Sequence, residues 1–168
     1  MSSYFDKNPK VSSNIREVKF SLYNKEYKIY TDNGVFSKNK IDEGTYIFLK
    51  VLVPLQLEGN ILDLGCGCGP IGLCLALTNS KARVSLADIN SRALLLASKR
   101  VEELGIKDRV TCLQSDIYEN IEGIYDVIVT NPPIRAGKKV TYLMFEGARQ
   151  YLKNDGQLYL VIRRKQGA

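Results

Sequence analysis

Apolar and polar positions alternate near the start of the chain and predict a two-stranded hairpin. The apolar positions of the first strand are Val18, Phe20 and Leu22. This period of two is typical of a strand with one buried face. A turn at 24–25 leads to a returning strand at 26–30. Residues 42–45 then provide a polar start for a helix that runs to about residue 55.

From residue 60 onward, short apolar runs alternate with helical patterns. Strands are expected at 61–64, 84–87, 110–113, 126–130 and 158–162, and helices at 70–77, 91–104 and 140–152. This alternation predicts an α/β fold with a doubly wound, mainly parallel, Rossmann-like sheet behind the N-terminal hairpin. Ligands of such sheets bind beyond the carboxyl ends of the strands, so the residues that follow each strand are the candidates for a site.

The chain has 168 residues, which suits one domain. We expect a flexible tail at 1–14 and a single domain at 15–168, with the hairpin and first helix at 15–58 and the ligand-binding core at 59–168. No run of about 20 apolar residues and no secretory signal is visible, so a cytoplasmic protein is expected. The net charge of +6 favours a polyanion such as nucleic acid as partner, although a charge that only aids solubility explains it equally well.

A glycine-rich turn follows the first strand of the core. Gly65, Gly67 and Gly69 stand at alternate positions, where glycine permits positive φ and close approach of a ligand. With Gly72, the last two also spell the G-x-G-x-x-G dinucleotide motif, which would suit a nicotinamide oxidoreductase. Asp63 argues against a pyrophosphate, because an acid at that strand end would repel it, and favours a cationic sulfonium ligand instead.

Two further acids follow the next two strands. Asp88 has two acceptor oxygens for ribose hydroxyls, although a helix N-cap is the simpler interpretation of this residue alone. Asp116 could accept a hydrogen bond from an adenine amino group, with Ile117 packed beside the ring. Three acids at three successive strand ends are a stronger indication of a nucleoside ligand than any one of them.

The most specific feature follows the fourth strand of the core, where Asn131 precedes two prolines. The prolines fix the backbone, so the Asn131 amide oxygen and the Pro132 carbonyl can be held outward. Two rigid acceptors can bind both hydrogens of an exocyclic amine and leave the nitrogen lone pair free to attack a methyl group. A rigid loop that merely ends a strand is the simpler alternative.

This ordered set resembles the class I S-adenosylmethionine-dependent methyltransferases. The segments 34–37, 42–45 and 131–138 resemble more narrowly the small-domain enzymes related to ribosomal RNA guanine-N2 methyltransferases, and the likeness covers about 15–168. The resemblance implies S-adenosylmethionine as cofactor, RNA as partner and no metal. The cofactor site that it implies comprises Asp63, Gly65, Cys66, Gly67, Gly69, Asp88, Ile89, Asp116, Ile117 and Asn131. Asn131 and Pro132 would be catalytic, and Phe36, Pro133, Ile134, Arg135 and Lys138 would contact substrate, with Thr45 nearby.

Two departures from the family pattern leave alternatives open. Many amine-methylating relatives have an aromatic residue where this chain has Ile134, so a protein glutamine amide or another base amine is an alternative substrate. Relatives also continue through another helix and two strands, so C-terminal strands are expected to be missing after the strand at 158–162. A non-catalytic RNA-binding module is therefore also an alternative.

Overall fold

The computed structural model describes residues 7–35, 40–132 and 137–162. A hairpin, β1 (Arg16–Leu22) and β2 (Lys25–Thr31), precedes helix α1 (Glu43–Leu52) and a short 3-10 turn at Val53–Leu55. The core then runs β3 (Gly59–Leu64), α2 (Pro70–Thr78), β4 (Ala82–Asp88), α3 (Ser91–Leu104), β5 (Val110–Gln114), β6 (Tyr125–Thr130), α4 (Gly137–Tyr151) and β7 (Leu152–Leu160). The predicted α/β fold with an N-terminal hairpin is confirmed.

The sheet has the order β5-β4-β3-β6-β7, and every neighbouring pair in it is parallel. The chain moves outward from β3 through β4 to β5, then returns to the other side of β3 as β6. The strand order therefore reverses between β3 and β6, and the ends of these two strands form the switch point where ligands of such sheets bind.

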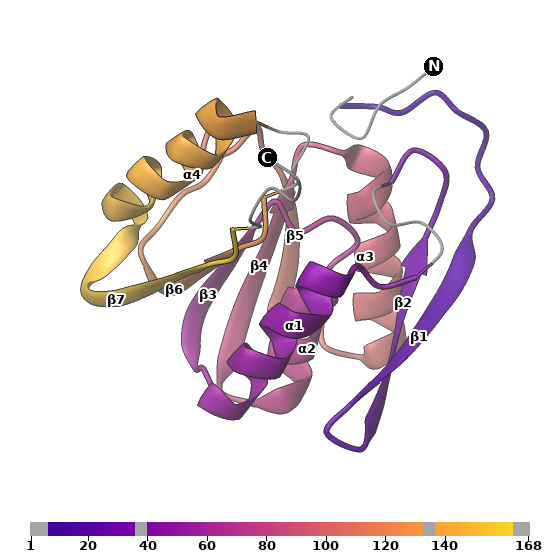
Figure 1. Ribbon diagram of the computed structural model, residues 1–168, viewed down its shortest axis with the longest axis horizontal. Helices are drawn as coiled ribbons and strands as arrows, with labels where there is room; N and C mark the ends of the chain where they lie inside the picture. The colour runs from indigo at the N-terminus through magenta and orange to yellow at the C-terminus, as the bar shows by residue number, and fades with distance from the viewer. Residues whose placement is uncertain (1–6, 36–39, 133–136, 163–168) are drawn as a thin grey trace, which may run out of the picture.

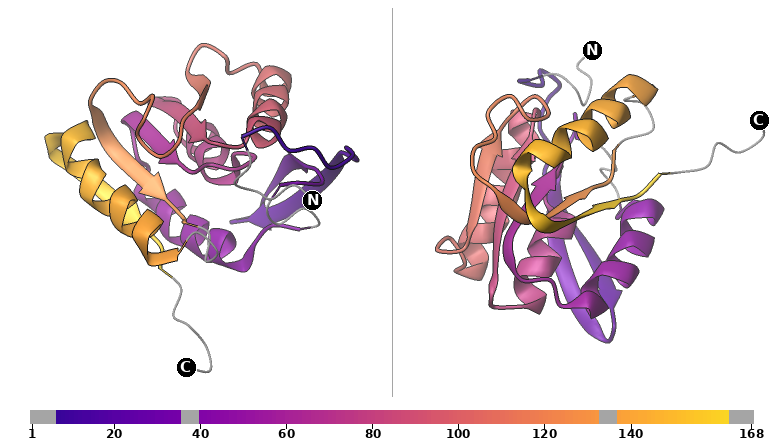
Figure 2. Two further views of the ribbon diagram at one scale, coloured as in Figure 1. Left: turned by 90° about the horizontal axis from the view of Figure 1, so that it is seen from above. Right: turned by 90° about the vertical axis from the view of Figure 1, so that its left-hand side faces the viewer.

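Helices cover both faces of this sheet (Figures 1 and 2). One face carries α2 and α3, with α1 beside α2 and the hairpin outside α3, whereas α4 lies against the other face over β6 and β7. The two sides of β3 show how the sequence achieves this, because Ile61 belongs to the larger apolar cluster and Leu62 and Leu64 belong to the cluster beneath α4. Alternate residues of a strand point to opposite faces, so a fully apolar strand is buried on both.

Helix α3 begins and ends at the residues that its sequence predicts. The Asn90 side chain accepts a hydrogen bond from the backbone N–H of Ala93, and Gly105 closes the helix in the left-handed conformation with φ 67°. The hairpin is attached to this helix by polar contacts. The Tyr30 hydroxyl donates to Glu103 at 2.6 Å, and the Arg100 guanidinium donates to the Lys28 carbonyl at 2.8 Å.

Strand β7 begins earlier than the sequence indicates. The Asn-Asp-Gly segment at 154–156 predicts a turn before a strand at 158–162, whereas β7 starts at Leu152, directly after α4. Tyr125 pairs with Leu152, but Val127, two residues on, pairs with Gln157. The turn-forming residues are thus accommodated as an irregularity inside the strand, where they interrupt the pairing without ending it.

Residues 7–14, expected as part of a terminal tail, are hydrogen-bonded to the domain. The carbonyl of Lys7 accepts from the Ser91 N–H at 3.0 Å, and the Ser13 hydroxyl donates to Asp32 at 2.6 Å. None of the helices in the described part of the chain is both long and apolar enough to cross a membrane.

Candidate active site

The glycine-rich turn after β3 presents backbone on its outer side and packs against the core on its inner side. Gly65 and Gly67 are half-buried and have φ of 70° and 59°, which glycine adopts without strain. The Cys66 N–H between them donates to the carbonyl of Ala87 at 2.9 Å and ties the turn to the end of β4. Gly69 faces inward, since a Cβ there would contact Leu73 and other core side chains at 3.3–3.4 Å.

Asp63 lies beneath this turn and is buried, with 1% of its surface exposed. Its carboxyl accepts a hydrogen bond from the Gly72 N–H at 2.8 Å, in the first turn of α2. The pKa of Asp63 is raised to about 7, chiefly by burial; the Gly72 hydrogen bond opposes the change, and the negative charge of Asp88 contributes to it. The carboxyl thus holds the start of α2 in place, and its predicted contact with a cationic ligand stays a prediction.

Gly72 is the position at which α2 approaches the sheet most closely. A Cβ at Gly72 would collide with the Leu86 side chain and stand 3.0 Å from both Val84 and the Asp63 carboxyl oxygen. We expect Gly72→Ala to lower the free energy of unfolding by about 1–3 kcal/mol, because overpacking displaces core side chains. Urea unfolding measures this. Gly123→Ala, where a Cβ would meet nothing within 4 Å but φ is 92°, should cost less, and an equal loss at both positions would contradict the account.

Asp88 joins the glycine turn to the start of α3. One oxygen of its carboxyl accepts from the Gly67 N–H at 2.8 Å, and the other accepts from the Asn90 N–H at 2.8 Å. The side chain is buried with 2% of its surface exposed. These two contacts fix the orientation of the carboxylate at the end of β4, and a carboxylate oxygen is the type of acceptor to which ligand hydroxyls donate.

The loop after β5 lies next to the end of β4. The Ser115 N–H donates to the Asp88 carbonyl at 3.0 Å, and the Gln114 side chain donates to the Ile89 carbonyl at 2.9 Å. Asp116 is exposed, while Ile89 and Ile117 are half-buried. An exposed acid and partly buried apolar side chains on these two neighbouring loops are the residue types that an adenine ring with an exocyclic amino group would require.

Asn131 lies at the switch point, beside the end of β3. The Thr130 hydroxyl, at the end of β6, donates to the carbonyl of Leu64 at 2.8 Å, so the residue before Asn131 is bonded to the residue before Gly65. The Asn131 amide nitrogen donates to the Thr45 hydroxyl oxygen at 2.9 Å. Thr45 therefore lies next to Asn131, because α1 approaches the end of β6 here.

The other predicted substrate contacts are less completely placed. Pro132 is half-buried and Lys138 is exposed near the start of α4. Phe36, Pro133, Ile134 and Arg135 lie outside the described residues. The structure thus brings Asp63, the glycine turn, Asp88 and Asn131 together at one edge of the sheet, as the sequence predicts.

Comparison with known proteins decides the class of this site. The family model described as methyltransferase small domain matches residues 26–168. The chain belongs to the methyltransferase small domain family. The predicted family resemblance and the methyltransferase class are confirmed, and the match favours this class over the dinucleotide interpretation of the glycine turn.

Individual relatives of this methyltransferase differ in how much of their length it covers. The uncharacterized protein YbxB of Bacillus subtilis is 41% identical over 167 residues, with 98% of this chain and 83% of YbxB covered. Ribosomal RNA small subunit methyltransferase C of Actinobacillus succinogenes is 36% identical over 137 residues, which are 79% of this chain and 40% of that protein. The chain thus spans about two fifths of the ribosomal RNA methyltransferase relatives that it matches.

A solved structure shows the same fold with ligands. The 16S rRNA N2 methyltransferase RsmC from T. Thermophilus, solved in complex with AdoMet and guanosine, superposes with a TM-score of 0.78 at 28% identity. The superposition covers 90% of this chain and 43% of that one.

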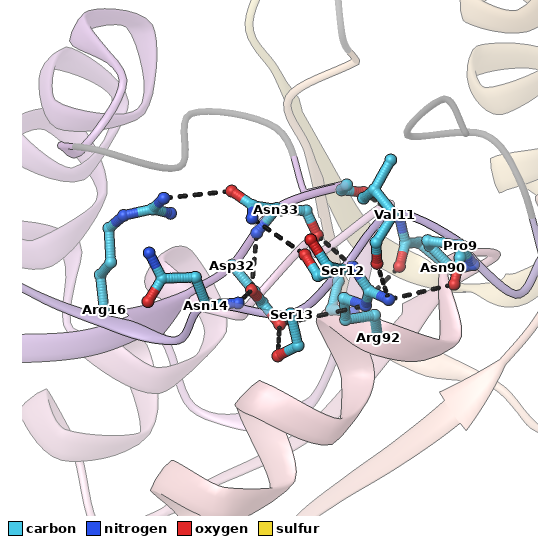
Figure 3. Close-up of polar contacts among 12 residues, drawn as sticks. Pro9, Val11, Ser12, Ser13, Asn14, Arg16, Asp32, Asn33, Asn90 and Arg92 are labelled. Carbon is cyan, nitrogen blue, oxygen red and sulfur yellow. Dashed lines mark hydrogen bonds and ion pairs between the residues drawn. The ribbon is translucent and has the colours of Figure 1, made fainter. Parts of the chain in front are cut away.

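Two residues of the methyltransferase that no sequence motif marks as functional hold the segments beside Asp88 in place. Figure 3 shows Asn90 and Arg92, at the start of α3, among the contacts that hold the 32–34 turn and the N-terminal segment. The Asn90 amide donates to the Gly34 carbonyl at 2.8 Å, and its backbone N–H bonds Asp88. The Arg92 guanidinium donates to the carbonyls of Asn33, at 2.7 Å, and Val11, at 2.6 Å. The position of Asn90, two residues after Asp88, is the sequence feature that could have indicated this contact.

Three of the four cysteines of the methyltransferase, Cys66, Cys68 and Cys74, are buried free thiols, and Cys112 is half-buried. Burial raises the pKa of Cys66, and it raises the pKa of Cys68 to about 12. Both therefore stay protonated and poorly nucleophilic at neutral pH. Within residues 7–35, 40–132 and 137–162, no group of three or more His, Cys, Asp or Glu side chains is arranged to hold a metal ion.

Proposed function

We propose that this protein transfers a methyl group from S-adenosylmethionine to the exocyclic N2 amine of a guanine in ribosomal RNA. One observation carries the proposal. The hydrogen bond from Thr130 to Leu64 places Asn131 directly beside the glycine turn, so a methyl donor on that turn would lie next to the amide that receives an amine. The relatives named as ribosomal RNA methyltransferases support the choice of RNA.

The described residues fit S-adenosylmethionine. Gly65 and Gly67 are half-buried and have no Cβ, so the methionine part could approach their backbone closely, and the Gly67 and Asn90 N–H groups hold the Asp88 carboxylate at the same edge, where ribose hydroxyls could donate to it. Asp116 is exposed and suits the adenine amino group, and the half-buried Ile89 and Ile117 on the same two loops suit the faces of the ring. Asp63 is buried behind Gly72 and supplies a carboxyl group. A cationic ligand nearby would favour the ionised form of this carboxyl.

The chemistry of the site follows from its two acceptors. Bound S-adenosylmethionine supplies an electrophilic methyl group. The Asn131 amide oxygen and the Pro132 carbonyl would each accept a hydrogen bond from one N–H group of the guanine amine. These two contacts would hold the nitrogen lone pair toward the methyl group. The nitrogen would gain the methyl group as the bond from sulfur to that methyl group breaks and S-adenosylhomocysteine leaves, and it would release one proton to water, so no strong base is needed.

The surface around the site suits a polyanion. The chain carries a net charge of +6, and Lys138 and Lys139 are exposed near the start of α4, which follows the Asn131 loop. We propose that Lys138 and Arg135 contact RNA phosphates, and that Phe36, Pro133 and Ile134 contact the target base. A ribosomal RNA substrate implies a cytoplasmic enzyme.

The test is methyl transfer to RNA that carries no modification. The chain is incubated with methyl-labelled S-adenosylmethionine and transcribed 16S rRNA, either free or assembled into small subunits, and the RNA is digested to nucleosides. We expect label in N2-methylguanosine. Label in another nucleoside would correct the target base, label in protein glutamine would replace RNA as substrate, and RNA binding without label would indicate a non-catalytic module.

A further inference from the structure

Thr45 makes a contact that the proposed reaction does not itself require. It lies in the first turn of α1 and is buried, with 7% of its surface exposed. Its backbone N–H donates to the Oδ2 atom of Asp42 at 3.2 Å, and its hydroxyl lies 3.5 Å from the same atom. The hydroxyl oxygen accepts a hydrogen bond from the Asn131 amide nitrogen at 2.9 Å. Thr45 therefore links the N-cap of α1 to the amide at the end of β6.

The donors and acceptors in this chain of contacts fix its direction. The Asn131 amide nitrogen is the donor in its contact with the Thr45 hydroxyl oxygen, so the single hydroxyl proton of Thr45 must point elsewhere, and Asp42 Oδ2, at 3.5 Å, is the acceptor on that side. The hydroxyl oxygen is then an acceptor toward Asn131, and the amide must turn its NH2 end to Thr45. Its oxygen is left for another donor. With the amide reversed, an NH2 group would face the two N–H bonds of the substrate amine, and donors would meet donors.

We propose that Thr45 is a positioning residue that sets which end of the Asn131 amide faces the substrate. The inference rests on the proposed function for its kinetic consequence, but the orientation of the amide is a property of the protein alone. Asp42 acts one step further away, because it orients the Thr45 hydroxyl as well as capping α1.

The kinetic test replaces the hydroxyl by a methyl group of similar shape. We expect Thr45→Val to lower kcat for methyl transfer to 16S rRNA by about 10- to 100-fold, because a misoriented acceptor loses the reactive geometry. The affinity for S-adenosylmethionine should change by less than about twofold, and Thr45→Ser should recover most of the rate, since serine keeps the hydroxyl. Thr78→Val is the matched control, because its hydroxyl bonds the Cys74 carbonyl at the far end of α2.

A second measurement needs neither substrate nor activity. The side-chain NH2 signals of Asn131 in a ¹⁵N–¹H spectrum, assigned by their loss in Asn131→Asp, report whether one N–H is hydrogen-bonded. In the wild type we expect one of the two protons shifted downfield and slowed in solvent exchange. Thr45→Ser should keep this pattern, whereas Thr45→Val should abolish it.

The two measurements separate the inference from the function on which it rests. An unbonded Asn131 NH2 group in the wild type, or wild-type kcat in Thr45→Val, would overturn the role of Thr45. A bonded NH2 group in a wild-type chain that methylates no RNA would sustain the orientation of the amide and reject the proposed substrate.

Discussion

Asn131→Ala is expected to lower kcat for methyl transfer by a factor of about 10²–10³, because the amine loses one of its two fixed acceptors. The affinity for S-adenosylmethionine should stay within a few-fold of the wild type. The glycine turn and Asp88 are held in place by hydrogen bonds within the protein that do not involve the Asn131 side chain. Single-turnover transfer of a labelled methyl group to 16S rRNA, together with a cofactor titration, measures both quantities.

The matched control for that substitution is Asn79→Ala. Asn79 follows α2, and its amide donates to the Gln56 carbonyl at 3.0 Å, away from the ends of β3 and β6. It should transfer methyl groups at the wild-type rate. If Asn131→Ala retained full kcat, the amine would have to be held by other groups, and the assignment of Asn131 as catalytic would be wrong.

Asp63 is expected to give the largest effect on stability. Its pKa is about 7 in the folded protein, against an ordinary value of 3.8. Between about pH 4 and pH 7 the unfolded chain is ionised at this residue while the folded chain keeps the proton, so stability is lost as pH rises. The difference corresponds to about 4 kcal/mol, present in full below pH 4 and lost above pH 7.

The comparison that isolates this effect is the wild type against Asp63→Asn. Asparagine can still accept from the Gly72 N–H, but it cannot ionise. Asp32 and Asp126 have lowered pKa values that act on stability in the opposite sense, and they cancel in the difference between the two proteins. Urea unfolding from pH 4 to 8 should show the wild type losing stability relative to the variant. A difference that is flat with pH would mean that Asp63 titrates near its ordinary value.

The sequence predicts the local structure of this domain well, because the signals are local. The Asn90 cap and Gly105 mark the ends of α3, and the acids and glycines at the ends of β3 and β4 mark the edge of the sheet where we propose that the cofactor binds. The sequence does not predict how the side chains within a motif are oriented. Gly69 packs against the core and Asp63 lies buried behind Gly72, since helix α2 must approach the sheet closely there.

The residue patterns of the sequence do not predict the hydrogen bonds between segments that are far apart along the chain. Thr45 and Asn131 are 86 residues apart, and their hydrogen bond exists because α1 lies beside the end of β6. Arg92 holds the N-terminal segment through carbonyl groups, which every residue has, so no side-chain pattern marks their location. The early start of β7 depends in the same way on its pairing with β6.

We propose that the glycine turn and Asp88 bind S-adenosylmethionine, and calorimetric titration of the chain with this cofactor measures that binding. We expect micromolar binding, weakened about tenfold in Asp88→Asn, which keeps the shape of the side chain but has one acceptor oxygen fewer for the ribose. NADH, titrated in parallel, should give no heat of binding. Binding of NADH with none of S-adenosylmethionine would contradict the account.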